Sequence, residues 1–161
     1  MADTRTTKAR LKEQSALLER QHLKETSELL EALERHFGPE VVDIVDRVVA
    51  ERTRRAWEEI AQREGHNSLE DLIRLVWSAE TQSRGYDLTI EPQGKGVMVR
   101  VRRCPVADMA RQLGVQKWAN HLICKGDKYM VEGFNPRLGF QHIQAFMEGG
   151  ECCQQFYFVK K

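Results

Sequence analysis

The side chains best suited to chemistry gather in the C-terminal half of this 161-residue chain. All four cysteines lie there, namely Cys104, Cys124, Cys152 and Cys153. The thiolate form of cysteine is both a nucleophile and a ligand for soft metals, so a group of thiols is compatible with either chemistry. A free cysteine is also among the most buried residue types, so core packing is the alternative for each of them.

Cys104 stands directly before Pro105. Proline suits the first turn of a helix, because its φ is already helical and its missing N–H is not needed there. The sequence therefore places Cys104 where a strand becomes a helix. A thiol at a helix N-terminus lies at the positive end of the helix dipole, which predicts a lowered pKa for at least one thiol of this group.

A second set of reactive types follows at helical spacing. His121, Cys124 and Asp127 fall within a pattern that predicts one helix from Val115 to about Glu132, capped by Gly133. Residues three or four apart are neighbours on a helix, so these three side chains are expected to meet.

Three helices are expected upstream. The first runs from residue 6 to about 37 and ends at Gly38-Pro39, the second runs from Pro39 to about Glu64, and the third starts at Ser68. Because the first half of the opening helix is poor in apolar residues, we expect it either to fray or to lie across a partner subunit. Residues 1–37 are therefore a candidate oligomerisation arm, and 38–161 are expected to form a single α+β domain with a cysteine-lined pocket.

After Gly85 the hydrophobic period changes from 3.6 to 2. Residues 86–90 and 97–101 predict a β-hairpin, and residues 138–143 and 153–159 predict two further strands. The predicted fold is therefore α+β, with N-terminal helices followed by ββ-αα-ββ and an antiparallel sheet. Because Cys152 and Cys153 would point to opposite faces of a strand, at most one of them is expected to join a single pocket.

The composition narrows the class of protein. Apolar residues make up 41%, charged residues 30%, and the net charge is +1. Such a chain is expected to be globular, with no global field to attract nucleic acid or a membrane. No apolar run approaches the roughly 20 residues that cross a bilayer. A cytoplasmic, reducing location is expected, where the thiols would stay free.

Four motifs in the final 65 or so residues resemble the L-2-amino-thiazoline-4-carboxylate hydrolase family. They are Arg103-Cys104-Pro105, Cys124-x-x-Asp127, Gly133-Phe134-Asn135-Pro136 and Gly150-Glu151-x-Cys153. A more distant likeness is to vinyl-reductase-type small-molecule-binding domains. The opening arm, to about residue 37, carries none of these motifs. The sequence departs from the family pattern at Gln154-Gln155, where an acidic residue followed by an aromatic residue or histidine is expected.

The resemblance implies hydrolysis of a cyclic amidine, in which a thiazoline ring opens to a carbamoyl-cysteine. The positions that match the family motifs are Cys104, Cys124, Asp127, Asn135 and Cys153. A thiolate attacks an amidine carbon readily, so Cys104 or Cys124 is the expected nucleophile.

Other side chains are candidates for the remaining roles in such a reaction. His121 or His142 is expected to carry protons, and Asp127 to orient or accept them. Arg102 or Arg103 is expected to hold a substrate carboxylate through a two-pronged contact.

Two alternatives remain open. A metal site would use Cys104, Cys124 and Cys153, whose soft thiolates favour zinc or copper(I), although the chain has neither Cys-x-x-Cys nor His-Glu-x-x-His. The other alternative is a binding domain without catalysis, which senses a small molecule, a metal or the redox state.

Overall fold

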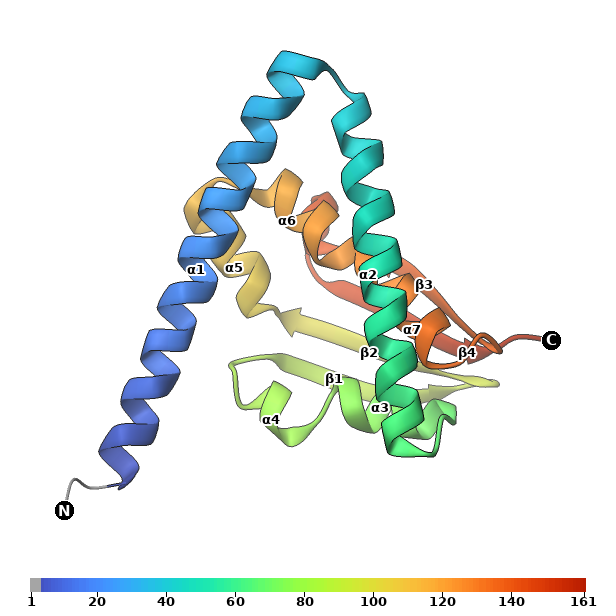
Figure 1. The fold of residues 1–161 in the computed structure, drawn as a ribbon. Helices are drawn as coiled ribbons and strands as arrows, with labels where there is room; N and C mark the ends of the chain where they lie inside the picture. Colours follow the sequence, from blue (N-terminus) through green and yellow to red (C-terminus); the bar gives the residue numbers. More distant parts are fainter. Residues whose placement is uncertain (1–3) are drawn as a thin grey trace.

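The computed structural model describes residues 4–161. Its two longest helices, α1 (Thr4–Phe37) and α2 (Glu40–Glu64), form the hairpin seen in Figure 1. Gly38 makes the tight turn between them with a φ of 99°, a conformation that favours glycine. Pro39 is the N-cap of α2. The helices and the break between them are close to those the sequence predicts.

Two short helices follow the hairpin. Helix α3 (Leu69–Val76) begins with a capping box, in which Ser68 and Asp71 each accept a backbone N–H from the other. Helix α4 (Ala79–Gln82) has Ser78 as its N-cap and was not expected from the sequence. Together they carry the chain to the sheet.

The four strands form one antiparallel sheet in the order β1-β2-β4-β3. Their bounds are Asp87–Gln93, Gly96–Arg103, Leu138–Gln144 and Cys153–Val159 for β1 to β4. The α+β class and the antiparallel pairing expected from the sequence are therefore confirmed. A short 3-10 turn, η2 (Phe146–Glu148), precedes β4.

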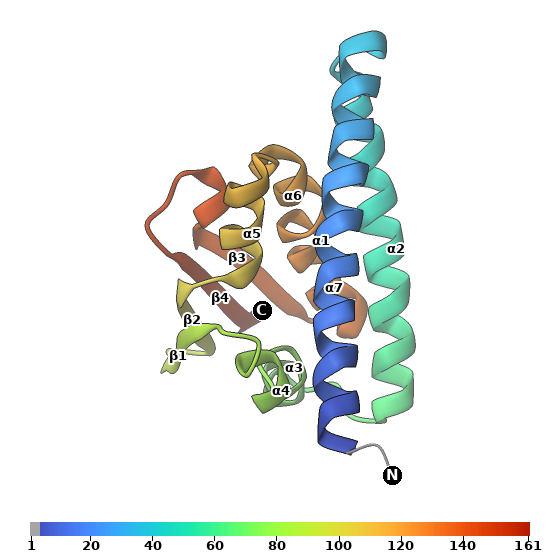
Figure 2. The same cartoon turned by 90° about the vertical axis from the view of Figure 1, so that its left-hand side faces the viewer.

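Successive side chains of β4 point to opposite faces of the sheet. Cys153, Gln155 and Tyr157 are buried on the face that the helices cover. Phe156 and Phe158 stack on the other face with ring centroids 5.4 Å apart. Figure 2 shows the helices gathered on one side of the sheet.

The segment between β2 and β3 is not the one long helix that the sequence predicts. After α5 (Pro105–Leu113) the chain forms α6 (Gln116–Leu122), the 3-10 turn η1 (Cys124–Gly126) and α7 (Asp127–Phe134). The break falls at Ile123, whose φ of −123° and ψ of −69° are not helical. On either side of this break, α6 and α7 both contact α2.

Helix α7 lies very close to α2. A Cβ at Gly133 would overlap the backbone carbonyl of Arg54, so only glycine fits there. The sequence predicts Gly133 as a helix cap, and this was wrong, because Gly133 lies within the last turn of α7 and Asn135 is the C-cap.

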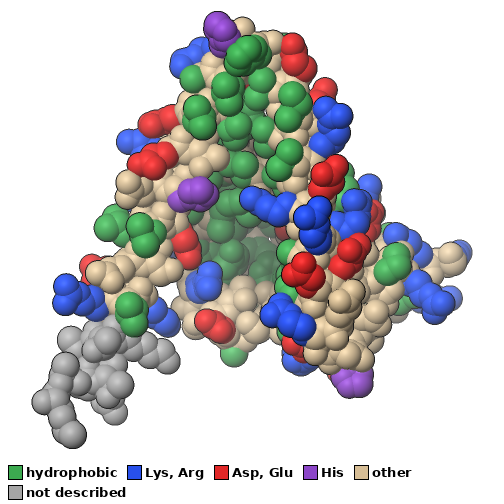
Figure 3. Space-filling model, in the orientation of Figure 1, with side chains coloured by type: hydrophobic (Ala, Val, Ile, Leu, Met, Phe, Trp, Pro, Cys, Tyr) green, Lys and Arg blue, Asp and Glu red, His purple; other side chains and the backbone are tan. Residues whose placement is uncertain are grey.

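Apolar side chains are also exposed on the hairpin, and Figure 3 shows them gathered between its two helices. Among the apolar side chains of the two helices, those of Leu29, Phe37, Ile44 and Val48 are each at least half exposed. The first half of α1 exposes Leu11, Leu17 and Leu18 as well. Self-association through residues 1–37 stays a prediction. Across residues 4–161, no helix combines the length and the apolar character needed to cross a membrane.

Candidate functional site

A cavity of about 200 Å³ lies between the covered face of the sheet and the helices. The structure brings three thiols to it, those of Cys104, Cys124 and Cys153, together with Asp127 and His142. Most of the remaining wall is apolar or aromatic. Ile123, one of the lining residues, is 39% exposed.

Each thiol is placed by the end of an element. Cys104 is the N-cap of α5, as its position before Pro105 predicts. Cys124 is the first residue of η1. Cys153 opens β4, and its sulfur accepts a hydrogen bond from the backbone N–H of Phe146 at 3.4 Å. Cysteines from three separate parts of the sequence therefore line one cavity.

A chain of hydrogen bonds forms the polar part of the cavity. Tyr157 donates its hydroxyl proton to Oε1 of Gln155 at 2.7 Å, which fixes the orientation of that amide. The amide nitrogen of Gln155 then donates to Oδ2 of Asp127 at 3.2 Å and lies 3.2 Å from Nε2 of His142. His142 Nε2 is 3.3 Å from the same carboxylate oxygen. Among the described residues, none donates a hydrogen bond to the other oxygen, Oδ1 of Asp127, which leaves that oxygen for a ligand.

Burial raises the pKa of all three cavity thiols. It raises the pKa of Cys153 to about 11, and it raises the pKa of Cys124 even further, with the charge of Asp127 adding to the effect. Burial also raises the pKa of Cys104, although the backbone N–H groups of Ala107 and Val106 act against it. The lowered pKa expected from the helix N-terminus is therefore wrong for these thiols, because desolvation outweighs the hydrogen bonds at the start of α5.

The pKa values of Asp127 and Tyr157, which also line the cavity, are raised as well. Burial raises the pKa of Asp127, and the hydrogen bond and charge of His142 oppose this only in part. Burial and the nearby Asp127 raise the pKa of Tyr157 well above its usual range. The cavity thus disfavours negative charge, and Asp127 is the acid within it that ionises most readily.

We expect the folded protein to lose stability between pH 9 and pH 11. In this window Cys153, whose ordinary pKa is 9.0 and whose folded pKa is about 11, is still protonated in the folded chain but ionised in the unfolded chain. The unfolded state then binds fewer protons, so the free energy of unfolding falls by about 1.4 kcal/mol per pH unit for such a thiol. The free energy of unfolding, measured by urea denaturation at several pH values in this range, should fall less steeply with pH for Cys153→Ala than for the wild type. Equal pH dependence in the two proteins would contradict the raised pKa of Cys153.

Four residues expected at the site lie elsewhere. Nδ1 of His121 is 2.6 Å from Oδ1 of Asp46, a contact between α6 and α2, so the break at Ile123 has turned this histidine away from Cys124 and Asp127. Arg102 makes a two-pronged contact with Asp87. Arg103 pairs with Asp108 at 3.3 Å. Asn135 bonds to the backbone of Asn67 and Arg137. None of the four lines the cavity.

The metal site considered from the sequence finds no support in the geometry. Within residues 4–161, no three His, Cys, Asp or Glu side chains are grouped closely enough to hold a metal ion. The three thiols share a cavity but occupy different parts of its wall.

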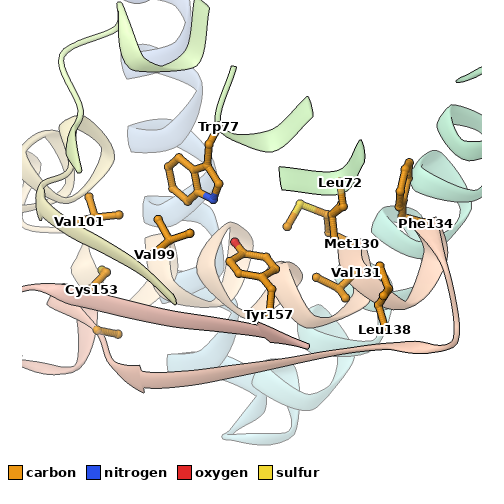
Figure 4. Packing of buried hydrophobic residues seen from close by; sticks show 11 residues of the cluster. Leu72, Trp77, Val99, Val101, Met130, Val131, Phe134, Leu138, Cys153 and Tyr157 are labelled. Carbon is orange, nitrogen blue, oxygen red and sulfur yellow. The ribbon is translucent and has the colours of Figure 1, made fainter. Parts of the chain in front are cut away.

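Among the cavity residues that were not anticipated from the sequence are Trp77, Tyr86, Gln155 and Tyr157. A signal existed for two of them, because Gln155 and Tyr157 are two and four residues after Cys153 and so share its face of the strand. Trp77 and Tyr86 flank α4, and their rings meet edge to face with centroids 5.8 Å apart. Figure 4 shows Trp77 above the sheet, with its indole nitrogen turned toward the hydroxyl of Tyr157.

Solved structures similar to this chain share its fold at low sequence identity. One is a trafficking protein particle complex subunit 3 from Naegleria fowleri covalently bound to palmitic acid, at 10% identity and TM-score 0.54, covering 89% of this chain and 96% of that one. Another is the phenol-responsive sensory domain of the transcription activator PoxR with phenol, at 14% identity and TM-score 0.52, covering 86% of this chain and 74% of that one. The search of curated proteins found no match.

The family comparison covers most of the chain. The model of the L-2-amino-thiazoline-4-carboxylic acid hydrolase family matches residues 16–157, so the match begins inside α1 and includes the second half of the arm that carries no motif. The resemblance found in the four C-terminal motifs is confirmed. The chain belongs to the L-2-amino-thiazoline-4-carboxylic acid hydrolase family.

Proposed function

We propose that the chain hydrolyses a carbon–nitrogen bond of a small cyclic amidine in the cavity. The observation that carries the proposal is the carboxylate of Asp127, which lies in a small, mostly apolar cavity beside three thiols. A carboxylate whose pKa is raised is a better proton acceptor than an ordinary one, as general acid–base catalysis requires. Membership of the hydrolase family supports the same reaction class.

Cys104 or Cys124 is the proposed nucleophile. Because burial keeps both thiols protonated near neutral pH, the attacking sulfur must lose its proton as it adds to the amidine carbon. Asp127 takes this proton and returns it to the ring nitrogen, which leaves as the carbon–nitrogen bond breaks. Water then adds to the carbon held on sulfur, the carbon–sulfur bond to the protein breaks, and the thiol regains its proton.

His142 and Gln155 are proposed to position Asp127 for this work. Both approach Oδ2, through contacts of 3.3 Å and 3.2 Å, so they hold the carboxylate in one orientation. Positioning of this kind keeps a proton acceptor within reach of the reacting atoms. Cys153, the third thiol, lines the cavity from the start of β4 and is proposed to contact the substrate.

Replacing the nucleophile tests the proposal. We expect Cys104→Ser or Cys124→Ser, whichever removes the attacking sulfur, to reduce release of the ring-opened product by at least a hundredfold, because a hydroxyl is a far weaker nucleophile than a thiol. Chromatography of the product with 2-amino-2-thiazoline as substrate gives the rates. Cys152→Ser is the matched control, because Cys152 bonds to Gln144 and does not line the cavity. Full activity in both variants would overturn the role of a thiol.

A second candidate function is ligand binding without turnover. The raised pKa of all three thiols favours it, since a protonated thiol is a poor nucleophile. The similar fold of a phenol-responsive sensory domain is compatible with it. Stoichiometric binding of a small amidine, measured by calorimetry, with no product after many hours would support this function over hydrolysis.

A further inference from the structure

We infer that the ligand of this cavity is an amidine without a carboxylate group, and thus differs from the amino-thiazoline carboxylate of the family name. The inference deepens the proposed function and rests on the same cavity. It concerns which cyclic amidines bind in the cavity, and it depends on the charged groups of the cavity wall.

The cavity wall carries a carboxylate and no permanent cation. Of the described residues that line it, none is lysine or arginine, and Asp127 is the only carboxylic acid. A ligand carboxylate would therefore be desolvated beside another carboxylate, with no positive partner to offset the cost. An amidinium group has the opposite sign and would pair with Asp127.

Two basic side chains close in sequence to cavity residues, those of Arg102 and Lys125, are engaged elsewhere. Arg102 holds Asp87 at 2.8 Å and 3.1 Å, and the side chains of both are more than half exposed. Lys125 reaches Asp46 at 3.3 Å on the α2 side. Neither basic residue lines the cavity.

His142 is the one histidine among the described residues that line the cavity. Its Nε2 lies 3.3 Å from Oδ2 of Asp127 and 3.2 Å from the amide nitrogen of Gln155. A proton on Nε2 would therefore be directed at the carboxylate of Asp127. The pair would then be neutral as a whole, and no net positive charge would remain for a ligand carboxylate.

The unused hydrogen-bonding atoms match an amidine. Oδ1 of Asp127 accepts no hydrogen bond from the described residues and can accept one from an amidine N–H. The indole N–H of Trp77, a residue only 9% exposed, has no hydrogen-bond partner and can donate to a ring heteroatom. The hydroxyl oxygen of Tyr157, whose proton is donated to Gln155, is the acceptor that the indole N–H faces, and a ring heteroatom of the ligand would replace it.

The size of the cavity sets the size of the ligand. An engineered protein cavity of about 150 Å³ holds one benzene molecule, so the 200 Å³ found here accommodates a single five- or six-membered ring with small substituents. A decarboxylated amino-thiazoline is a ligand of this kind.

A matched pair of compounds tests the inference by binding alone. We expect calorimetry at pH 7 to give at least a hundredfold tighter binding for 2-amino-2-thiazoline than for 2-amino-2-thiazoline-4-carboxylate, each with the wild-type protein. Asp127→Asn should reduce this preference to less than tenfold, because it removes the negative charge. Trp77→Phe should weaken the binding of 2-amino-2-thiazoline about tenfold. The ratio between the affinities of the two compounds should stay at least a hundredfold.

Binding of the two compounds with equal affinity, tighter binding of the carboxylate, or binding of neither at millimolar concentration would each overturn the inference. Turnover is judged separately from binding. If 2-amino-2-thiazoline binds selectively but is never hydrolysed, the proposed hydrolysis fails while the inference stands. If the carboxylate binds more tightly and is hydrolysed, the inference fails while the hydrolysis stands.

Discussion

Asp127→Asn is expected to reduce turnover of a cyclic amidine by a factor of about 10² to 10⁴, the usual contribution of a general acid–base group. The amide cannot take the proton of the attacking thiol, although it has nearly the same shape as the carboxylate. The measurement is kcat for product release, compared with the wild type at the same pH. Turnover within threefold of the wild type would show that Asp127 does not carry the proton.

The same substitution is expected to change the pH dependence of stability. Burial raises the pKa of Asp127 above its ordinary 3.8, so between 3.8 and the raised value the carboxyl is ionised in the unfolded chain but still protonated in the folded chain. The unfolded state binds fewer protons in that window, and stability falls as the pH rises through it. Urea denaturation from pH 4 to pH 7 should show this loss in the wild type and a smaller one in Asp127→Asn.

Asp46→Asn is the matched control for both measurements of Asp127. Asp46 also contacts a histidine, His121, at 2.6 Å, but this pair joins α2 to α6 and does not line the cavity. We expect the control to keep its turnover whatever it does to stability. A loss of turnover equal to that of Asp127→Asn would mean that the assay reports on folding.

Gly133→Ala is expected to cost the fold about 3 kcal/mol, at the upper end of the usual range for overpacking. The added methyl would overlap the carbonyl oxygen of Arg54 and lie 2.9 Å from its Cα, and backbone atoms cannot rotate away as a side chain can. Helices α2 and α7 would have to separate, which would also displace Asp127 at the start of α7. The midpoint of urea denaturation gives the change in stability.

Gly126→Ala provides the comparison for Gly133→Ala. Its Cβ would meet the side chain of Thr53, with Oγ1 at 3.3 Å, and a side chain can adjust by a few tenths of an ångström. We expect stability to fall by less than about 1 kcal/mol. The higher helix propensity of alanine over glycine is worth a similar amount and offsets the cost of the contact. Equal losses at the two positions would contradict the close backbone contact assigned to Gly133.

Much of the fold could be predicted because its signals are local. The capping box at Ser68 and Asp71, the alternating valines of β2 and the proline after Cys104 each indicate one structure from a few neighbouring residues. The break at Ile123 could not be predicted in this way. Val115 to Glu132 is helical in pattern throughout, and its division into α6, η1 and α7 depends on how each part packs against α2.

The candidate site was predictable to a similar extent. Cys104, Cys124 and Cys153 carry an unusual residue type, so composition alone draws attention to them. Trp77 and Tyr86 carry no such signal, since an aromatic residue near the end of an element is ordinary core in most proteins. His121 was misplaced because its expected position depended on an unbroken helix.

The alternation of side chains along β4 makes the chemistry of the cavity depend on strand register. Cys153, Gln155 and Tyr157 enter the cavity because they occupy alternate positions, while Phe156 and Phe158 face the other way. A one-residue shift of β4 in its pairing with β2 and β3 would present Phe156 and Phe158 to the cavity and send the thiol and the amide outward. Among relatives of this chain, we therefore expect the register of β4 to be kept when the loop before it changes length, because such a shift would replace a polar lining with an aromatic one.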